Sequence, residues 1–216
     1  MPSLIDIKNL TVQFNGTSVL QNFSLAVEAG QKVTISGRSG SGKSTILRCI
    51  LGFVNPTSGE VSIDGEALSS GSVWKLRRKL AYVAQEPQLG EGTTEEIMQQ
   101  PFQYKANSHL KQNLERLPDY MDHFHLPQKL LQEDVADLSG GEKQRIAIIS
   151  ALTLDRKIFL LDEATSALDP ESKEIVIDYF CSNDDLTVLA VSHEKDLTCF
   201  SDQVIRLTPA FQGGER

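Results

Sequence analysis

The sequence predicts a single α/β domain of 216 residues, with a mostly parallel sheet, helices, an antiparallel β layer and an inserted α-helical subdomain. Three observations carry this prediction. Short apolar runs typical of buried parallel strands, such as Ile158–Leu161, alternate with helical segments. Alternating apolar runs before residue 28 favour antiparallel strands. Between about residues 86 and 154 the pattern becomes polar and mostly helical in period.

The first quarter of the chain contains mainly short strands. Strands are expected at residues 4–7, 10–14 and 23–27. The Asn15-Gly16 pair between the last two favours a tight antiparallel turn. A buried strand is expected at residues 33–36, followed by a helix from Ser44 to Leu51 that Gly52 ends.

The helical insertion interrupts an α/β alternation. Before it we expect a strand at 61–63, a short basic helix at 73–78 and a strand at 80–84. Prolines break the insertion at Pro101, Pro118 and Pro127. After it we expect strands at 158–161, 186–191 and 204–207, and helices at 143–152 and from Asp169-Pro170, with the aspartate as N-cap. The expected division is a core subdomain of about 1–85 and 155–216, and a helical subdomain of about 86–154.

Composition narrows the class of protein. A formal charge of -8 argues against a nucleic-acid-binding protein, which usually carries a basic stripe. The three cysteines lack metal-like spacing, which favours small buried thiols in a reduced, cytoplasmic setting. The N-terminus lacks a basic stretch followed by an apolar one, so no signal peptide is expected. No run approaches about 18 consecutive apolar residues, so any action at a membrane is expected to depend on a partner.

One segment matches the phosphate-binding pattern G-x-x-x-x-G-K-[ST], follows an expected strand and opens an expected helix. Its backbone amides would wrap phosphates, Lys43 would neutralise the β- and γ-oxygens, and the Ser44 hydroxyl would be a Mg²⁺ ligand. The alternative is a glycine-rich loop of purely structural use. The residues expected to bind nucleotide here are Gly37, Arg38, Ser39, Gly40, Ser41, Gly42, Lys43, Ser44 and Thr45.

A second candidate phosphate-binding element, Leu138–Glu142, lies roughly a hundred residues further along the chain. Gly140 and Gly141 let the backbone approach a ligand closely, and Ser139 adds a hydroxyl donor. The positive end of the following helix would point at an anion. Because this element has no lysine placed to hold a whole nucleotide, the two elements together imply that one nucleotide is bound from two sides.

Two carboxylates, Asp162 and Glu163, end an apolar strand. Asp162 would lie at the carboxyl edge of the sheet, where ligands gather in open α/β folds and where it can orient Mg²⁺ through water. Glu163 can accept a proton from the water that attacks the γ-phosphate. The alternative is a strand that ends in a solvated acidic turn.

With Gln85, Ser166–Asp169 and His193, these motifs stand in the order and spacing of the ATP-binding-cassette (ABC) ATPases, which the chain resembles over essentially its whole length. The resemblance implies that Gln85 senses Mg²⁺ and the attacking water, and that His193 contacts the γ-phosphate. It also implies that Asp169 communicates between paired subunits and that Phe14 stacks on adenine. Each of these residues also has a plainer alternative. Gln85 would be a polar strand end, and His193 would be a histidine whose hydrogen bonds are satisfied where it lies. Asp169 would be only an N-cap, and Phe14 would be a core phenylalanine.

The resemblance further implies a head-to-tail homodimer when ATP is bound. Ser139, Gly140 and Gly141 of one chain would close over the nucleotide bound to Lys43 of the other, and a single copy of each motif means that two chains are needed. Closure on the γ-phosphate and release after hydrolysis would convert chemistry into motion. Since every catalytic position is filled, we expect a competent Mg²⁺-dependent ATPase.

The favoured kind of ABC protein is the ATP-binding subunit of a bacterial membrane transporter, peripheral on the inner face of the cell membrane through an integral permease. The permease surface is expected within residues 85–127, with Phe102, Tyr104 and Phe124 either contacting the permease or packing in a helical core. Stretches such as Leu138–Arg145 are similar to small systems assigned to iron or metal export. The alternatives are a soluble ABC ATPase of DNA repair or translation, and an importer or lipoprotein-release ATPase; no nucleic-acid partner is expected.

Overall fold

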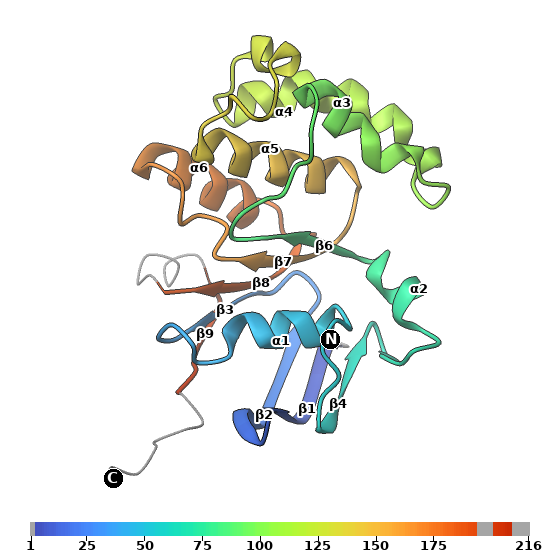
Figure 1. Cartoon of the computed structure of the whole chain (residues 1–216), viewed down its shortest axis with the longest axis vertical. Helices are drawn as coiled ribbons and strands as arrows, with labels where there is room; N and C mark the ends of the chain where they lie inside the picture. The colour runs from blue at the N-terminus through green and yellow to red at the C-terminus, as the bar shows by residue number, and fades with distance from the viewer. Residues whose placement is uncertain (1–2, 194–200, 209–216) are drawn as a thin grey trace.

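The computed structural model describes residues 3–193 and 201–208, and these form two sheets and several helices stacked in layers (Figure 1). One sheet is antiparallel, with the order β2-β1-β4-β5. Its strands are β1 (Ser3–Phe14), β2 (Thr17–Glu28), β4 (Ser58–Ile63) and β5 (Glu66–Ala67). Asn15 and Gly16 form the turn between β1 and β2, both with positive φ, as the Asn-Gly pair predicts.

The second sheet has five strands in the order β6-β7-β8-β3-β9, and every neighbouring pair is parallel. Its strands are β3 (Lys32–Ser36), β6 (Leu80–Val83), β7 (Ile158–Asp162), β8 (Thr187–Ser192) and β9 (Gln203–Arg206). The predicted combination of a parallel sheet and an antiparallel layer is confirmed. Because parallel strands end at a common edge, the residues that follow β3, β6, β7 and β8 are brought together.

Strand β7 shows how the parallel sheet separates two cores. Ile158 and Leu160 belong to the core on one face, and Phe159 and Leu161 belong to the core on the other. The first core lies between the two sheets and contains the apolar face of helix α1 (Lys43–Ile50). Figure 1 shows α1 lying between β3 and the β1–β4 layer.

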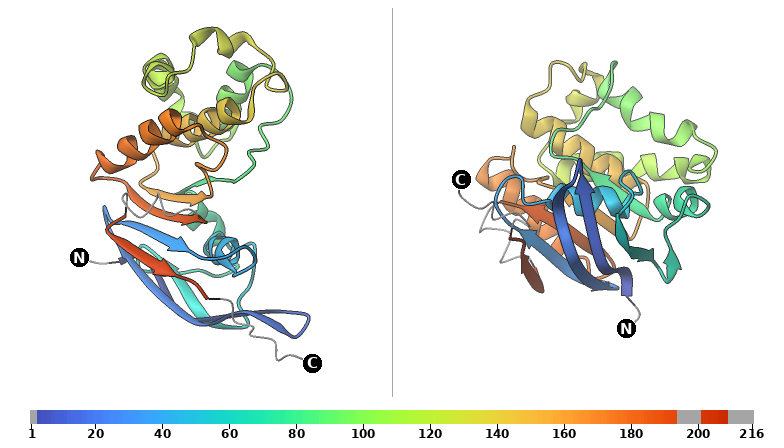
Figure 2. Two further views of the ribbon diagram at one scale, coloured as in Figure 1. Left: turned by 90° about the vertical axis from the view of Figure 1, so that its left-hand side faces the viewer. Right: turned by 60° about the horizontal axis from the view of Figure 1, so that its bottom comes forward.

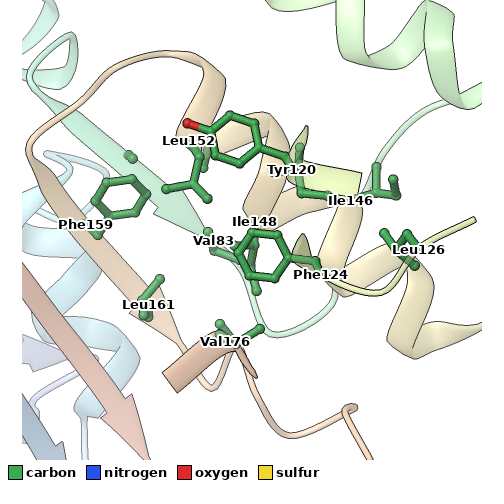
Figure 3. Packing of buried hydrophobic residues seen from close by; sticks show 14 of the residues in the cluster. Val83, Tyr120, Phe124, Leu126, Ile146, Ile148, Leu152, Phe159, Leu161 and Val176 are labelled. Atoms are coloured by element: carbon green, nitrogen blue, oxygen red, sulfur yellow. The ribbon is translucent and has the colours of Figure 1, made fainter. Parts of the chain in front are cut away.

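The second core packs the parallel sheet against helices α4 (Leu117–His123), α5 (Gly140–Thr153) and α6 (Pro170–Cys181) (Figure 3). Phe102 and Phe124 are buried, so the core interpretation of these two aromatics is confirmed and neither is available to a permease. Tyr104 is 66% exposed and remains a candidate contact. The cluster runs from β6 and β7 into α4 and α5, and the predicted subdomain division remains a prediction.

The insertion is less regularly α-helical than its sequence period predicts. It contains α3 (Thr94–Gln99) and α4, and the other helical turns are 3-10 helices at Gln100–Gln103, Ser108–Arg116 and Gln128–Gln132. Pro101, Pro118 and Pro127 each lie at the start of one of these elements, since proline fits a helix start but lacks the N–H that a helix interior needs. Figure 2 shows the insertion and the antiparallel layer at opposite ends of the molecule.

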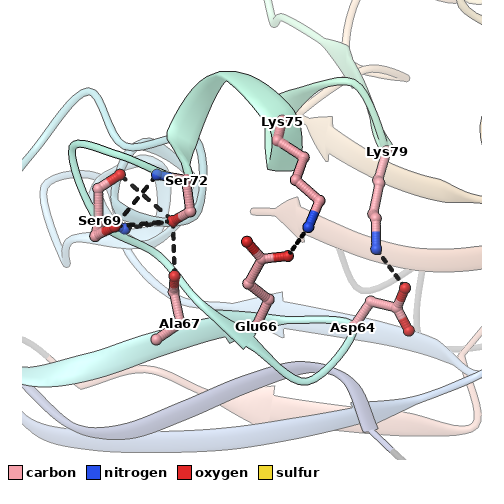
Figure 4. Close-up of polar contacts among 7 residues, drawn as sticks. All are labelled: Asp64, Glu66, Ala67, Ser69, Ser72, Lys75 and Lys79. Carbon is pink, nitrogen blue, oxygen red and sulfur yellow. Dashed lines mark hydrogen bonds and ion pairs between the residues drawn. The ribbon is translucent and has the colours of Figure 1, made fainter.

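A short helix, α2 (Val73–Arg77), connects the antiparallel layer to β6. Ion pairs from Lys75 to Glu66 and from Lys79 to Asp64 join this segment to the β4–β5 hairpin, and the Ser72 hydroxyl donates to the Ala67 carbonyl at 2.7 Å (Figure 4). The ion pairs are exposed and contribute little stability individually. Together with the hydroxyl contact they fix the path by which the chain enters β6.

The expectation of small buried thiols holds for one of the two described cysteines. Cys49 lies on the buried face of α1, and burial raises the pKa of its thiol to about 11. Cys181 is exposed at the end of α6, so the expectation is wrong there. Cys199 lies outside the described residues.

Candidate functional site

The glycine-rich loop connects β3 to α1, in the strand–loop–helix arrangement that its motif requires. Gly42, the N-cap of α1, has a φ of +96°, and a Cβ there would lie 3.0 Å from a methyl group of Leu20 and 3.1 Å from Val19. Glycine is required at this position both by the backbone conformation and by the approach of the β1–β2 hairpin. The hairpin therefore forms one wall beside the loop.

Lys43 is only 4% exposed and its side chain curls back into the loop. Its ammonium donates to the carbonyl oxygens of Gly37 at 2.9 Å and Arg38 at 3.2 Å. Burial lowers the pKa of Lys43, whereas the nearby carboxylates of Glu163 and Asp162 oppose that shift. The loop thus holds a buried cation next to the backbone amides that would meet a phosphate.

The acidic pair lies at the carboxyl edge of the sheet, beside the loop. The Ser44 hydroxyl donates to Oδ1 of Asp162 at 2.9 Å, across 118 positions of sequence. Glu163 is buried and has a φ of +50°, a conformation that a non-glycine residue adopts only where its surroundings hold it. Its N–H donates to the Val191 carbonyl at 3.0 Å, which ties the residue after β7 to β8.

His193 follows β8 and completes the cluster. Its Nε2 lies 2.7 Å from Oε1 of Glu163, and both ring nitrogens lie 3.2 Å from Nζ of Lys43. Lys43 is itself 3.8 Å from Oε1 of Glu163. The structure therefore brings Lys43, Glu163 and His193 into mutual contact from three separate segments.

A cavity of about 260 Å³ opens over this cluster. It is lined by Val19, Ser39, Gly40, Gly42, Lys43, Ser44, Thr45, Gln85, Glu163 and His193. Most of these are predicted nucleotide-site residues. Their gathering round one polar cavity is an arrangement that can bind phosphates and place a carboxylate against an attacking water.

Phe14 ends β1 and pairs with Thr17 across the hairpin turn. Its ring is 47% exposed, so the core interpretation is wrong for this residue. Val19, on the same hairpin, lines the cavity, although Phe14 does not. Stacking of Phe14 on adenine remains a prediction.

The Ser139 segment is built differently. Ser139 is the N-cap of α5 and forms a reciprocal capping box with Glu142: its N–H donates to Oε2 of Glu142 at 2.8 Å, and its hydroxyl accepts from the Glu142 N–H at 3.3 Å. Hydrogen bonds from Ser139 lower the pKa of Glu142. The helix begins at Gly140, so the expected start at Lys143 is wrong: the capping box draws both glycines into the first turn.

The same segment faces away from the cavity of its own chain. Ser139 and Gly140 are exposed, a Cβ on Gly140 would meet no atom within 4 Å, and neither residue lines the cavity. Gly141 is closer to other backbone, since its Cβ position lies 3.3 Å from the Ala167 carbonyl oxygen. Within one chain, the two predicted phosphate-binding elements do not form a common site.

Asp169 lies at the N-terminus of α6. Its carboxylate accepts the Ser172 N–H at 3.0 Å, which confirms the predicted N-cap. Hydrogen bonding with Ser172 lowers the pKa of Asp169. The carboxylate is exposed, and its role between subunits remains a prediction.

Two residues near the site were missed by the sequence reasoning. The Tyr82 hydroxyl donates to Oδ2 of Asp162 at 3.1 Å, and the buried Gln144 side chain donates to the Ala84 carbonyl at 3.1 Å, directly before Gln85. A polar group in an otherwise apolar strand was the only available signal for Tyr82. For Gln144 the signal was a polar amide side chain at a position where the helical period of the sequence predicts an apolar residue.

Among residues 3–193 and 201–208, no helix is long and apolar enough to cross a membrane.

Comparisons with known proteins agree with this site. A family model described as ABC transporter matches residues 20–166. The chain is 34% identical over 209 residues to the probable iron export ATP-binding protein FetA of Escherichia coli K12, covering 95% of this chain and 92% of that protein. It is 36% identical over 213 residues to the energy-coupling factor transporter ATP-binding protein EcfA1 of Streptococcus agalactiae, covering 95% and 76%.

A solved structure is also similar. It is the dimeric post-hydrolysis state of the ATP-binding cassette MJ0796 bound to ADP and Pi, which aligns with a TM-score of 0.83 and 29% identity over 94% of each chain.

Proposed function

The chain belongs to the ABC transporter family and is an ATPase subunit of a membrane transporter, and we propose that it couples hydrolysis of Mg²⁺-ATP between two copies of itself to metal export, with iron as the favoured cargo. The observation that carries the ATPase chemistry is the mutual contact of buried Lys43 and Glu163 with His193 at the edge of the 260 Å³ cavity.

The proposed hydrolysis uses this chain's own groups at each position. The loop amides and Lys43 bind the phosphates, because a buried ammonium among backbone donors complements an anion. Glu163, oriented by His193 Nε2 at 2.7 Å, accepts the proton of the water that attacks the γ-phosphate. His193 then contacts the γ-phosphate itself, and Gln85, which lines the same cavity, orients the water.

The donor set fits Mg²⁺. The Ser44 hydroxyl and the Asp162 carboxylate lie 2.9 Å apart, and Gln85 borders the same cavity, so the groups present are the hard oxygen donors that this ion prefers. Ser44 would bind the ion directly, and Asp162 would hold it through water. When bound, the ion would neutralise phosphate charge.

The exposed Ser139 segment supports the two-chain site. The segment faces no nucleotide site within its own chain, although it offers three kinds of phosphate-binding group. These are the Ser139 hydroxyl, the amides of Gly140 and Gly141, and the positive end of the 14-residue helix α5. A second copy packed head to tail would bring them over the nucleotide bound at Lys43. Asp169 and Gly141 lie on neighbouring segments of that same surface, as a role between subunits requires.

The metal-export proposal is supported by the similarity to FetA along 92% of that protein. The rival is import. The similarity to EcfA1, an energy-coupling factor transporter ATP-binding protein, supports a transporter role without favouring export. In either case we propose that the chain is peripheral on the inner face of the membrane, bound to an integral permease.

The test is purification of the tagged full-length chain from solubilised membranes of its own cells. We expect an integral permease to copurify; recovery of ribosomes or DNA in its place would contradict the transporter proposal. The complex is then reconstituted in vesicles and ATP-driven Fe²⁺ flux is measured, with a Lys43→Ala complex as control. Flux away from the ATPase-bearing face supports export. Flux toward that face supports the import alternative, and no ATP-driven iron flux overturns the cargo assignment.

A further inference from the structure

Tyr82 makes a contact that the nucleotide site does not otherwise explain. It lies on β6, next to β7, and its hydroxyl donates to Oδ2 of Asp162 at 3.1 Å. The other carboxylate oxygen, Oδ1, accepts from the Ser44 hydroxyl at 2.9 Å. Asp162 is buried, so its two oxygens are shared between a hydroxyl from β6 on one side and a hydroxyl from α1 on the other.

The Tyr82 hydroxyl is suited to act as a permanent donor. A phenol is protonated throughout the neutral range, so its O–H is available to donate to a carboxylate oxygen at the 3.1 Å separation seen here. A tyrosine ring has few rotatable bonds, so its hydroxyl is a fixed point for the carboxylate.

The carboxylate needs such a fixed point. The terminal torsion of aspartate is broad and roughly two-fold, so a carboxylate that no protein donor holds can rotate. The Ser44 hydroxyl cannot serve as the anchor if, as proposed above, it binds the cation. In that state Tyr82 is the partner among the described contacts that would still hold Asp162.

We propose that Tyr82 is a positioning residue that anchors Oδ2 of Asp162, keeps Oδ1 directed toward Ser44, and thereby strengthens binding of the divalent cation that accompanies ATP. The proposal rests on the cation roles proposed for Ser44 and Asp162. Outer-shell partners of this kind typically change metal affinity by about tenfold or more. Tyr82 does not line the cavity proposed to bind nucleotide, so its expected effect is on cation affinity.

The test is Tyr82→Phe, which removes the hydroxyl and keeps the ring. Binding of a non-hydrolysable ATP analogue to the purified full-length chain is measured by calorimetry with Mg²⁺ and again with EDTA. In the wild-type chain Mg²⁺ strengthens binding. In Tyr82→Phe we expect that strengthening to fall by about tenfold, with binding in EDTA unchanged. A purely structural tyrosine would change both measurements together, or neither.

The matched control is Tyr104→Phe, which removes the hydroxyl of an exposed tyrosine in the insertion and is expected to leave both measurements unchanged. Equal Mg²⁺ strengthening in Tyr82→Phe and wild type overturns the role of Tyr82 while leaving the proposed function intact. Absence of any Mg²⁺ effect in the wild-type chain contradicts the proposed cation site itself. Thermal melting of all three proteins establishes that the variants are folded.

Discussion

The two elements proposed to bind phosphate, at Lys43 and at Ser139, differ in how many of their polar contacts are already formed within the chain. Around Lys43 the polar groups are already in contact with one another: the buried ammonium contacts two carbonyl oxygens, the buried Glu163 carboxylate and the His193 ring. At Ser139 the polar groups are exposed, and their contacts are those of a helix cap. The first element is preorganised by its own chain, whereas the second is folded and, in the proposed two-chain site, is completed by a second copy.

The difference has a physical origin in how each element is positioned. The Lys43 cluster depends on the carboxyl ends of parallel strands, which the sheet brings to one edge. Ser139 depends only on the capping box of α5, which is local. In the proposed dimer, the catalytic groups are held by contacts within one chain, and the closing element belongs to the other chain. This division suits an enzyme whose chemistry must be coupled to motion.

The largest expected effect is the loss of ATP turnover when Glu163 is replaced. Glu163→Gln keeps the side chain's size and its place beside His193 but removes the base, so we expect turnover to fall by about a thousandfold. ATP binding should persist, because the phosphate donors are untouched. Steady-state hydrolysis and ATP calorimetry on the same preparation check this pair of outcomes. Undiminished hydrolysis would remove Glu163 as the base.

The next largest expected effect is the loss of ATP affinity when Lys43 is replaced. Lys43→Ala removes a buried cation and leaves the phosphates without their main counter-charge, so we expect ATP affinity to fall by about a hundredfold. Calorimetry measures this directly. Lys143→Ala, at an exposed end of α5 near Ser139, is a charge-matched control and should bind ATP normally. Unchanged ATP binding in Lys43→Ala would contradict the assigned loop.

The smallest effect is expected from substituting Ser139. Because this residue is both a helix cap and a proposed ligand contact, the experiment must distinguish the loss of one role from the loss of the other. Ser139→Ala should cost about 1 kcal/mol of stability through the lost cap. It should also lower turnover by about tenfold through the lost phosphate donor. Thr93→Ala is the matched control, because Thr93 and Glu96 form the same capping box at α3. Equal turnover in the two variants would mean that Ser139 is only a cap.

Mixing variants tests the two-chain site itself. In a head-to-tail dimer of one Lys43→Ala chain and one Ser139→Ala chain, both defects fall in the same site and the other site is intact. Random pairing should then restore about a quarter of wild-type hydrolysis, more than either variant alone provides. If mixing gave no gain in hydrolysis, both elements would act within one chain, and the proposed two-chain site would be wrong.

Much of the fold followed from local sequence signals. Asn15-Gly16 predicted the hairpin turn, and Asp169-Pro170 predicted the start of α6, because turns and caps are decided by a few adjacent residues. The 3-10 turns of the insertion were missed because their apolar spacing is close to that of an α-helix. The start of α5 was missed because the capping box outweighs the low helix propensity of two glycines.

The sequence by itself determined the loop at Lys43, the carboxylates that end β7, and the cap at Asp169, since each depends on neighbours along the chain. Only the tertiary structure decided which of them meet. Lys43 and His193 are 150 positions apart, and Tyr82 and Asp162 are 80 apart. These contacts follow from the strand order β6-β7-β8-β3, which local propensities do not encode. The same order leaves Ser139 outside the cavity, because α5 packs on one face of the sheet while the cavity lies at its edge.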